Sequence, residues 1–147
     1  MENIGYLLSD CSRLLRRAFD EQVRALGVTG AQARLLFYLT RWEGENQGFY
    51  AEQLDVEPIT LCRMVDRMEE GGMIERRSDP SDRRARRLFL TKRSREVLPV
   101  LKECIDKLLE DMLTGITETE RANFARTLTA IGANLGARRD QKVANHG

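Results

Sequence analysis

The most informative segment is residues 58–91, PITLCRMVDRMEEGGMIERRSDPSDRRARRLFLT. Its first half predicts a helix, because apolar side chains recur at helical spacing and form one stripe. That stripe consists of Leu61, Cys62, Val65 and Met68. The opposite side carries Thr60, Arg63, Met64 and Arg67. Pro58 suits the first position of a helix, and the glycine pair at 71–72 suits its end.

Two short strands, 74–78 and 85–90, follow this helix and enclose the loop DPSDRR. The turn formers Asp79-Pro80 and Asp82 favour a hairpin, with Leu88 and Leu90 on one face. From residue 75 to residue 95, nine Lys/Arg stand against three Asp/Glu, which leaves a local net charge of +6. The whole chain carries only +1, so the remainder carries −5. Such asymmetry is typical of a surface that binds a polyanion.

A helix with an outward Thr/Arg face beside a basic hairpin fits duplex DNA. The helix would enter the major groove, and the loop tip would lie along the backbone or in the minor groove. Arginine is used here in preference to lysine, and its planar fork suits phosphate and base edges. Two alternatives stay open: a solvated charged hairpin, and a winged-helix interaction module that binds an acidic protein.

These motifs resemble the MarR family of winged helix-turn-helix regulators, and its SlyA-like branch most closely. The resemblance spans nearly the whole chain, and its most specific motif is the wing DPSDRRARR with the later Leu90-Thr91. Other matching positions are Gln47 to Leu54, Pro58, Thr60, Arg63, residues 65–67, residues 72–74 and residues 82–84. The chain departs from the family pattern at Gly48, Tyr50 and Ser94. The resemblance implies a homodimer held by the first, fifth and sixth helices.

The segments on either side predict further helices. They are expected from about residue 3 to 25, from a cap at Thr29 to near Trp42, from 47 to 54 after Asn46, from a cap at Thr91 to Gly115, and after the capping box of Thr117 and Glu120. Residues 43–46 read as a polar loop, and residues 140–147 as a frayed tail. The predicted fold is mostly α with a small β-hairpin wing.

Residues 28–91 are expected to form the winged helix-turn-helix DNA-binding lobe, and residues 1–27 and 92–147 the dimerisation helices, within one compact domain. The apolar stripes of the terminal helices exceed what the central lobe can cover, which favours burial against a second copy. A dimer also matches the symmetry of duplex DNA, where recognition helices fall about one helical turn apart.

The expected DNA contacts follow from this arrangement. The residues assigned to the recognition helix are Pro58, Thr60, Arg63 and Arg67, and those assigned to the wing are Arg83, Arg84 and Arg86. Asp66 and Asp82 are expected to orient the wing, Asp66 through an ion pair with a wing arginine. Repression by occlusion of a pseudo-palindromic operator is the default mode, because the chain shows no activation segment.

An effector site is a further expectation. Many members of the family bind small aromatic acids or other hydrophobic anions, and the candidate contacts here are Arg13, Arg16, Tyr38 and Trp42. The aromatic cluster of Phe37, Tyr38 and Trp42 is otherwise expected to lie mostly in the hydrophobic core. The cysteines Cys11, Cys62 and Cys104 lie on apolar stripes, where inert packing is the favoured interpretation and a thiol-based redox sensor the alternative. The sensing position of some relatives corresponds to Gly5 here.

Other functions find little support in the sequence. The one histidine, His146, lies in the tail, and no phosphate-cradling glycine loop or nucleophile elbow occurs. We therefore expect no enzyme, no metal and no cofactor. No apolar run approaches the roughly 20 residues of a membrane span. The N-terminus lacks a signal-peptide pattern, and three cysteines without metal-ligand spacing suit a reducing cytoplasm.

Overall fold

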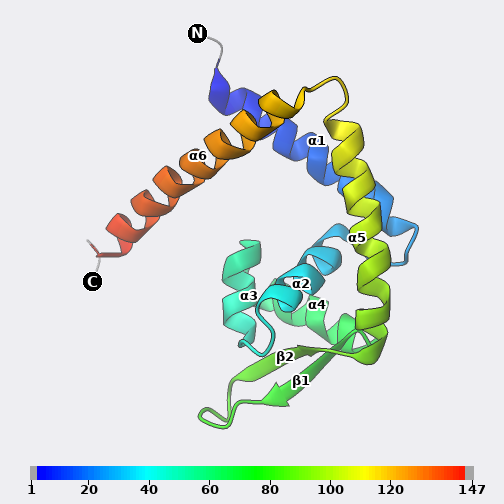
Figure 1. The fold of residues 1–147 in the computed structure, drawn as a ribbon. Coiled ribbons are helices and arrows are strands. Elements are labelled where there is room, and N and C mark those ends of the chain that lie inside the picture. Colours follow the sequence, from blue (N-terminus) through cyan, green and yellow to red (C-terminus); the bar gives the residue numbers. More distant parts are fainter. Residues whose placement is uncertain (1–2, 145–147) are drawn as a thin grey trace. The chain divides into compact units, whose positions relative to one another are not determined.

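The computed structural model describes residues 3–144, which form six helices and one two-stranded antiparallel sheet (Figure 1). The elements are α1 (Ile4–Arg24), α2 (Gly30–Arg41), α3 (Gln47–Leu54), α4 (Pro58–Glu70), β1 (Ile74–Ser78), β2 (Arg86–Leu90), α5 (Lys92–Met112) and α6 (Glu118–Ala144). The predicted fold class, mostly helical with a small hairpin, is confirmed. Among these helices none is both long and apolar enough to cross a membrane. The chain divides into two units after Leu108.

The first unit is built around α2. Its side chains Ala33, Leu35 and Leu39 are completely buried, as the nearly all-apolar sequence predicts. Thr29 begins the helix with a capping box, in which its hydroxyl accepts from the amide of Gln32 and its amide donates to the Gln32 side chain, both at 3.1 Å. The other elements contribute the buried residues Val23, Tyr50, Ala51, Leu54, Leu61, Val65, Met68, Leu88, Leu90, Leu98 and Leu101. One of these residues comes from α1 and two come from α5, so both helices contribute to the core of the lobe.

A tight turn separates α3 from α4. Asp55 ends α3 in the left-handed conformation, with φ of 54°. Pro58 opens α4 as predicted, and Glu57 stands at the cap position without a side-chain hydrogen bond. At the other end of α4, Gly72 takes the left-handed conformation, with φ of 72°, and the chain turns into β1. The pair of helices α3 and α4 therefore has the short connection of a helix-turn-helix unit.

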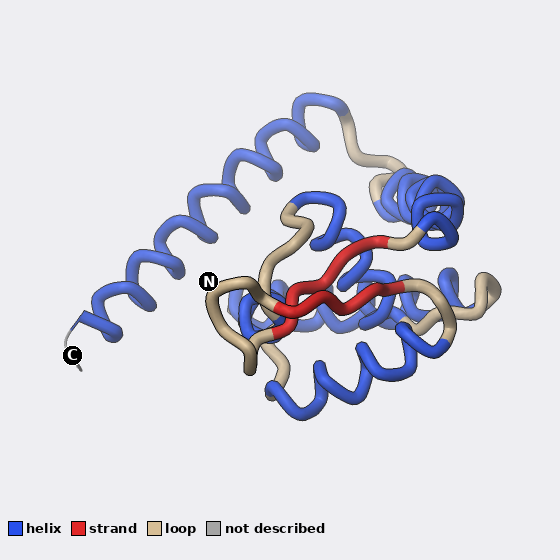
Figure 2. Tube along the Cα trace, turned by 90° about the horizontal axis from the view of Figure 1, so that it is seen from below, coloured by secondary structure: helices blue, strands red, loops and turns tan. Residues whose placement is uncertain are grey.

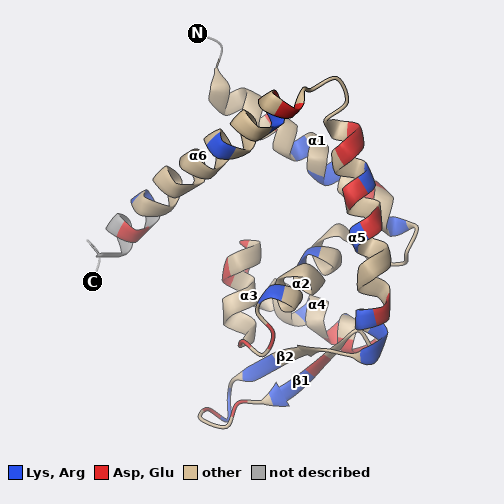
Figure 3. Cartoon of the chain, in the orientation of Figure 1, with Lys and Arg blue, Asp and Glu red and all other residues tan. Residues whose placement is uncertain are grey.

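The hairpin pairs Ile74 with Leu90 at its base and Ser78 with Arg86 near its tip (Figure 2). Both strands contain arginine residues, and the Lys and Arg positions of the hairpin are blue in Figure 3. Strand β2 begins one residue later than predicted, because the amide of Ala85 donates to the Asp82 carbonyl (3.1 Å) within the turn.

The segment expected to be a polar loop, residues 43–46, is paired with the other edge of β2. The amide of Gly44 donates to the Leu88 carbonyl at 2.9 Å, and the amide of Leu88 donates to the Glu45 carbonyl at 3.1 Å. A further bridge joins Asn46 to Arg87. Strand β2 is thus held on both sides by backbone hydrogen bonds, which fixes the base of the wing on the α2–α3 connection.

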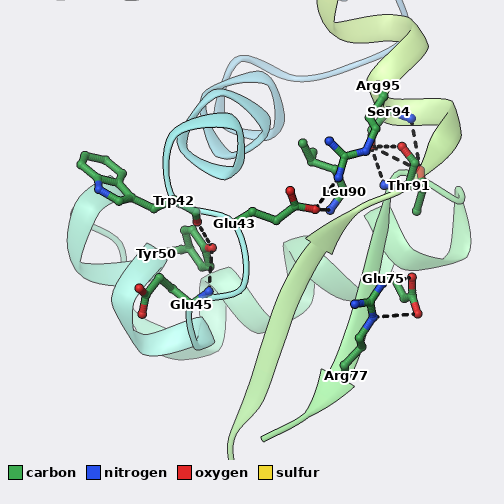
Figure 4. Close-up of polar contacts among 10 residues, drawn as sticks. All are labelled: Trp42, Glu43, Glu45, Tyr50, Glu75, Arg77, Leu90, Thr91, Ser94 and Arg95. Carbon is green, nitrogen blue, oxygen red and sulfur yellow. Dashed lines mark hydrogen bonds and ion pairs between the residues drawn. The ribbon is translucent and has the colours of Figure 1, made fainter.

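Tyr50 stabilises the connection between α2 and α3. Its phenol is buried, its hydroxyl donates to the carbonyl of Trp42, and it accepts from the amide of Glu45 at 3.1 Å (Figure 4). Burial raises the pKa of Tyr50 to about 12, because the phenolate is disfavoured away from water. The departure from the family pattern at Tyr50 therefore has a structural reason: the hydroxyl closes the loop at residues 42–45.

The start of α5 is capped by two hydroxyl groups. The amide of Ser94 donates to Thr91 Oγ1 at 3.1 Å, and the amide of Thr91 donates to Ser94 Oγ at 2.8 Å. Ser94 is fully buried, yet its hydroxyl also donates to the Thr91 carbonyl at 3.0 Å. The serine that departs from the family pattern thus completes a reciprocal cap.

The second unit holds the last turn of α5 and the whole of α6. Its capping box is confirmed: the amide of Glu120 donates to the Thr117 hydroxyl at 3.2 Å, and Glu120 accepts from the Thr117 amide at 2.9 Å. Arg121 donates to the carbonyls of Leu113 (2.9 Å) and Ile116 (3.1 Å), which closes the turn. The expectation of a frayed tail from residue 140 is wrong up to Ala144, since α6 continues that far. Residues 145–147, which include His146, lie outside the described chain.

The terminal helices expose much of their apolar surface in the single chain. The exposed side chains on α1 and α6 include Ile4, Tyr6, Leu7, Leu8, Leu14, Phe124 and Leu135. The three cysteines are free thiols, and Cys11 is exposed whereas Cys62 and Cys104 are half-buried. Cys11 lies on the apolar stripe of α1 that is expected to be buried against a second copy, so its inert packing stays a prediction.

We expect Tyr50→Phe to lower the free energy of unfolding by about 1–2 kcal/mol, because the Glu45 amide and the Trp42 carbonyl lose their shared partner. Chemical denaturation at fixed protein concentration measures this loss. Tyr6→Phe is the matched control, since Tyr6 is 74% exposed. Equal stabilities of the two variants would contradict the role of the Tyr50 hydroxyl.

Candidate nucleic-acid interface

The outer face of α4 carries the residues expected to meet DNA. Pro58, Thr60, Arg63 and Arg67 are all exposed. They are exposed because Leu61, Val65 and Met68 occupy the opposite stripe and bury it in the core. Met64 does not belong to this face, as it is half-buried and packs on the core. Ile59, an apolar residue outside the stripe, is exposed beside Thr60.

The wing tip presents Arg83, Arg84 and Arg86 to solvent. Two aspartates shape the turn beneath them. Asp79 accepts from the amide (2.9 Å) and the hydroxyl (2.7 Å) of Ser81, and Asp82 accepts from the amide of Arg84 at 2.9 Å. Each is a local turn in which a side chain replaces a backbone acceptor. The arginines are therefore carried by a loop whose own carboxylates are engaged in holding its shape.

The carboxyl of Asp79 is the most perturbed acid in this loop. The Ser81 amide, then the Ser81 hydroxyl, and to a lesser degree the guanidinium of Arg87 (3.2 Å) lower the pKa of Asp79 to about 2. All three groups stabilise the charged form. The loop conformation is thus linked to an ionised Asp79 at any pH near neutrality.

Arg76 of β1 joins the hairpin to both helices of the helix-turn-helix unit. Its side chain is only 15% exposed and forms ion pairs with Asp66 (2.6 Å) and Glu69 (3.4 Å) of α4. Its Nε donates to Gln47 of α3 at 2.7 Å, and its Nη2 donates to the carbonyl of Cys62 at 3.1 Å. The guanidinium therefore spans α3, α4 and β1. The wing arginine that Asp66 contacts is Arg76, which stands on the strand and not at the tip.

Other arginines of the basic segment are also engaged within the molecule. Arg77 pairs with Glu75 at 3.2 Å and lies over the ring of Phe89 at 3.9 Å. Arg87 and Arg95 pair with acids as well, so four of the nine cations have carboxylate partners. Within residues 3–144, the basic side chains of this segment without an ion pair are Arg83, Arg84, Arg86, Lys92 and Arg93. The local charge of +6 therefore overstates the charge available to a partner.

Glu43 connects the wing to α5. One of its carboxylate oxygens accepts from the amide of Leu90 at 3.1 Å and from the guanidinium of Arg95 at 2.6 Å (Figure 4). Strand β2 ends at Leu90, and α5 begins at Lys92. The shared oxygen thus fixes the exit of the hairpin on the segment that follows α2.

The residues expected to contact an effector have partners within the chain. The rings of Tyr38 and Trp42 stack with centroids 5.9 Å apart, and Arg41 lies over Trp42 at 4.5 Å. Arg13 pairs with Asp10 at 3.7 Å, and Arg16 is exposed on α1. A cavity of about 630 Å³ between α2, β2 and α5 has a different lining, which comprises Phe37, Thr40, Glu43, Leu90, Arg95, Leu98, Pro99 and Lys102.

Two residues that matter for this interface, Arg76 and Ile59, are not identified by the sequence pattern. Arg76 was counted among the cations available to a polyanion, and nothing in its sequence position distinguishes it from Arg77. Ile59 could have been noticed, because it is a large apolar residue that stands off the buried stripe of its own helix. A single exposed apolar residue is common on protein surfaces, so what distinguishes Ile59 is its position beside Thr60 and one turn before Arg63.

Comparison with known proteins gives a consistent result. The family model described as "MarR family" matches residues 28–85. A solved structure of MarR is 28% identical, covers 95% of each chain and superposes with a TM-score of 0.87. The transcriptional regulator PA3341 is 32% identical over 92% of this chain and 99% of its own, with a TM-score of 0.81. The transcriptional regulator SlyA is 25% identical over 90% and 94%, with a TM-score of 0.79.

We expect Arg76→Gln to lower the free energy of unfolding by about 2 kcal/mol, because it leaves Asp66, Glu69 and Gln47 without their common donor. Arg76→Lys should recover part of the loss, since it keeps the charge and loses the fork. The matched control is Arg77→Gln, whose smaller effect follows from the exposure of Arg77 and Glu75. Equal losses at positions 76 and 77 would contradict the proposed difference between the two arginines.

The carboxyl of Asp79 should titrate with a midpoint of about 2, measured by carboxyl-carbon NMR. Since folding lowers this pKa from 3.8, the stabilisation is complete above about pH 4 and is lost as the pH falls through about 2. Ser81→Ala removes a hydroxyl donor and should raise the midpoint. Arg87→Gln should raise it less, because Arg87 contributes less to the shift. A midpoint near 3.8 in the unmodified protein would contradict the turn geometry.

Proposed function

Since the chain belongs to the MarR family, we propose that it is a sequence-specific regulator of transcription and not an enzyme. It binds double-stranded DNA as a homodimer at a pseudo-palindromic operator and represses by occluding the promoter. One observation carries the proposal: the exposed Thr/Arg face of α4 lies in the same lobe as a hairpin whose tip arginines have no ion pair in the described chain. The free cations are thus those that a duplex would meet.

In this proposal α4 lies in the major groove. Pro58 and Thr60 stand in its first turn, and Arg63 follows one turn later. The N-terminal residues of a recognition helix reach base edges, whereas residues further along meet the backbone. Arg63 therefore reads guanine through its fork, and Arg67 lies closer to phosphate.

The wing works on the neighbouring part of the duplex. Arg83 and Arg84 lie at the loop tip and enter the minor groove or follow the backbone. Arg86, the first residue of β2, adds a further exposed cation beside them. Asp82 shapes the loop through the Arg84 amide. Asp66 acts on the wing through Arg76, so its effect on DNA is one of orientation.

The dimer is proposed to form through residues 1–27 and 92–147. The apolar side chains exposed on α1, α5 and α6 support this, because a soluble monomer rarely exposes so many. The wing motif and Leu90-Thr91 support placement in the SlyA-like branch. Three free thiols fit a cytoplasmic protein.

A small aromatic or anionic ligand is proposed to release the protein from DNA. The aromatic surface of the stacked Tyr38 and Trp42 is one candidate contact, and the exposed guanidinium groups of Arg13 and Arg16 are the other. A planar acid would stack on the rings or accept charge-assisted hydrogen bonds from an arginine.

Selection of genomic fragments with the purified protein tests the regulator assignment. A DNA reader enriches one pseudo-palindrome with half-sites about one helical turn apart, and its affinity falls steeply with salt. A module that binds an acidic protein, the rival function, would enrich no sequence. A redox-sensing regulator would enrich one sequence and lose it on treatment with peroxide.

Arg63→Lys should lower the affinity for the selected operator at least severalfold and leave binding to random DNA nearly unchanged. The physical reason is that lysine keeps the charge and loses the two bonds to guanine, which discriminate by roughly 1–3 kcal/mol. Arg84→Ala is the contrasting variant: it should weaken binding to both duplexes and reduce the salt slope by about 1. Titrations of both duplexes at several salt concentrations measure these effects. Equal losses for Arg63→Lys on operator and random DNA would assign Arg63 to the backbone.

A further inference from the structure

One large apolar side chain is exposed where the proposed dimer does not explain it. The exposed large hydrophobic residues within 3–144 are Ile4, Tyr6, Leu7, Leu8, Leu14, Ile59, Val100, Leu109, Met112, Ile116, Phe124 and Leu135. All except Ile59 lie on α1, α5, α6 or the turn between the last two helices, which are the elements assigned to the dimer. Ile59 lies on α4 and is 60% exposed.

The residues around Ile59 show that it does not lie at the margin of the hydrophobic core. Its sequence neighbours Glu57, Pro58 and Thr60 are all exposed. It precedes Arg63 by four residues, so the two side chains share one face of the helix, one turn apart. The buried stripe begins only with Leu61. Ile59 therefore points to the same side as the arginine assigned to base readout.

The chemistry of isoleucine limits what it can recognise. It has no hydrogen-bonding group, so on a base edge it can make only an apolar contact. In the major groove the apolar feature is the C5-methyl group of thymine, which the other three bases lack. Residue 59 is the second residue of α4, and the first turn of a recognition helix is the part that reaches base edges.

We propose that Ile59 is a specificity-determining residue that packs on the C5-methyl group of one thymine in each half-site. The inference rests on the proposed function and adds a base preference to it. The expected effect on DNA affinity follows from the burial of one thymine methyl group. This corresponds to a change of about fourfold in affinity per half-site. Two half-sites together give a factor of roughly fifteen.

The test replaces single thymines of the selected operator by uracil, which removes the methyl group and leaves the hydrogen-bonding edge intact. The unmodified protein should lose about fourfold in affinity at one thymine position of each half-site. Ile59→Ala should bind the thymine and uracil versions equally at that position. Ile59→Val, which keeps a branched apolar side chain, should retain most of the difference. Glu70→Gln, an exposed change at the far end of α4, is the control and should retain the full difference.

The outcomes separate this inference from the proposed function. If the unmodified protein binds its operator specifically and no uracil replacement weakens it, the role of Ile59 is overturned while the regulator stands. The same holds if Ile59→Ala keeps the sensitivity of the unmodified protein. If selection enriches no sequence at all, the regulator assignment fails and takes the inference with it. Circular dichroism checks that Ile59→Ala is folded, which its exposed position leads us to expect.

Discussion

The geometry of the winged lobe depends on the guanidinium of Arg76. A hairpin of two five-residue strands has little core of its own and cannot hold an orientation by itself. Arg76 reaches from the first strand to the carboxylates of Asp66 and Glu69, to the side chain of Gln47 and to a carbonyl of α4. No other common side chain has enough donors in one plane to satisfy partners on two helices. Because α3, α4 and β1 share this group, the helix and the wing have one relative orientation.

A second principle of the lobe is the division of its arginines into two kinds. Arg76, Arg77 and Arg87 are neutralised by acids of the same lobe. Arg76 joins the hairpin to α4, Arg87 joins β2 to the loop at Asp79, and Arg77 pairs with Glu75 within β1. Arg83, Arg84 and Arg86 lie at the tip without such partners among the described residues. The first kind makes the wing rigid and the second makes it attractive to an anion. An equally basic loop without these ion pairs would lose more conformational entropy when it bound an anion. The paired arginines reduce that loss.

Much of the fold follows from local signals in the sequence. The caps at Thr29 and Thr117, the proline that opens α4 and the two-residue alternation of β2 are short-range features, so the sequence was sufficient to predict them. The structural features that the sequence did not predict involve partners distant along the chain. The pairing of residues 43–46 with β2 and the contacts of Arg76 with α3 both require tertiary contact, which no local pattern encodes. Met64 lies between the buried and the exposed face of α4, where the helical periodicity of the sequence does not determine whether a side chain is buried. The proposed roles of the site residues in DNA binding are predictions of the same kind, since they depend on a partner molecule.

The junction between α4 and α5 has a mechanical consequence. The carbonyls of Gly71 and Gly72, which directly follow α4, accept from Arg93 (2.5 Å) and from the Thr91 hydroxyl (2.6 Å) at the start of α5. Both bonds cross between helices that are joined in sequence only through the whole hairpin. A tilt of α5 about its first turn would stretch them unless α4 moved with it. These two hydrogen bonds therefore couple the start of α5 to the C-terminal end of α4.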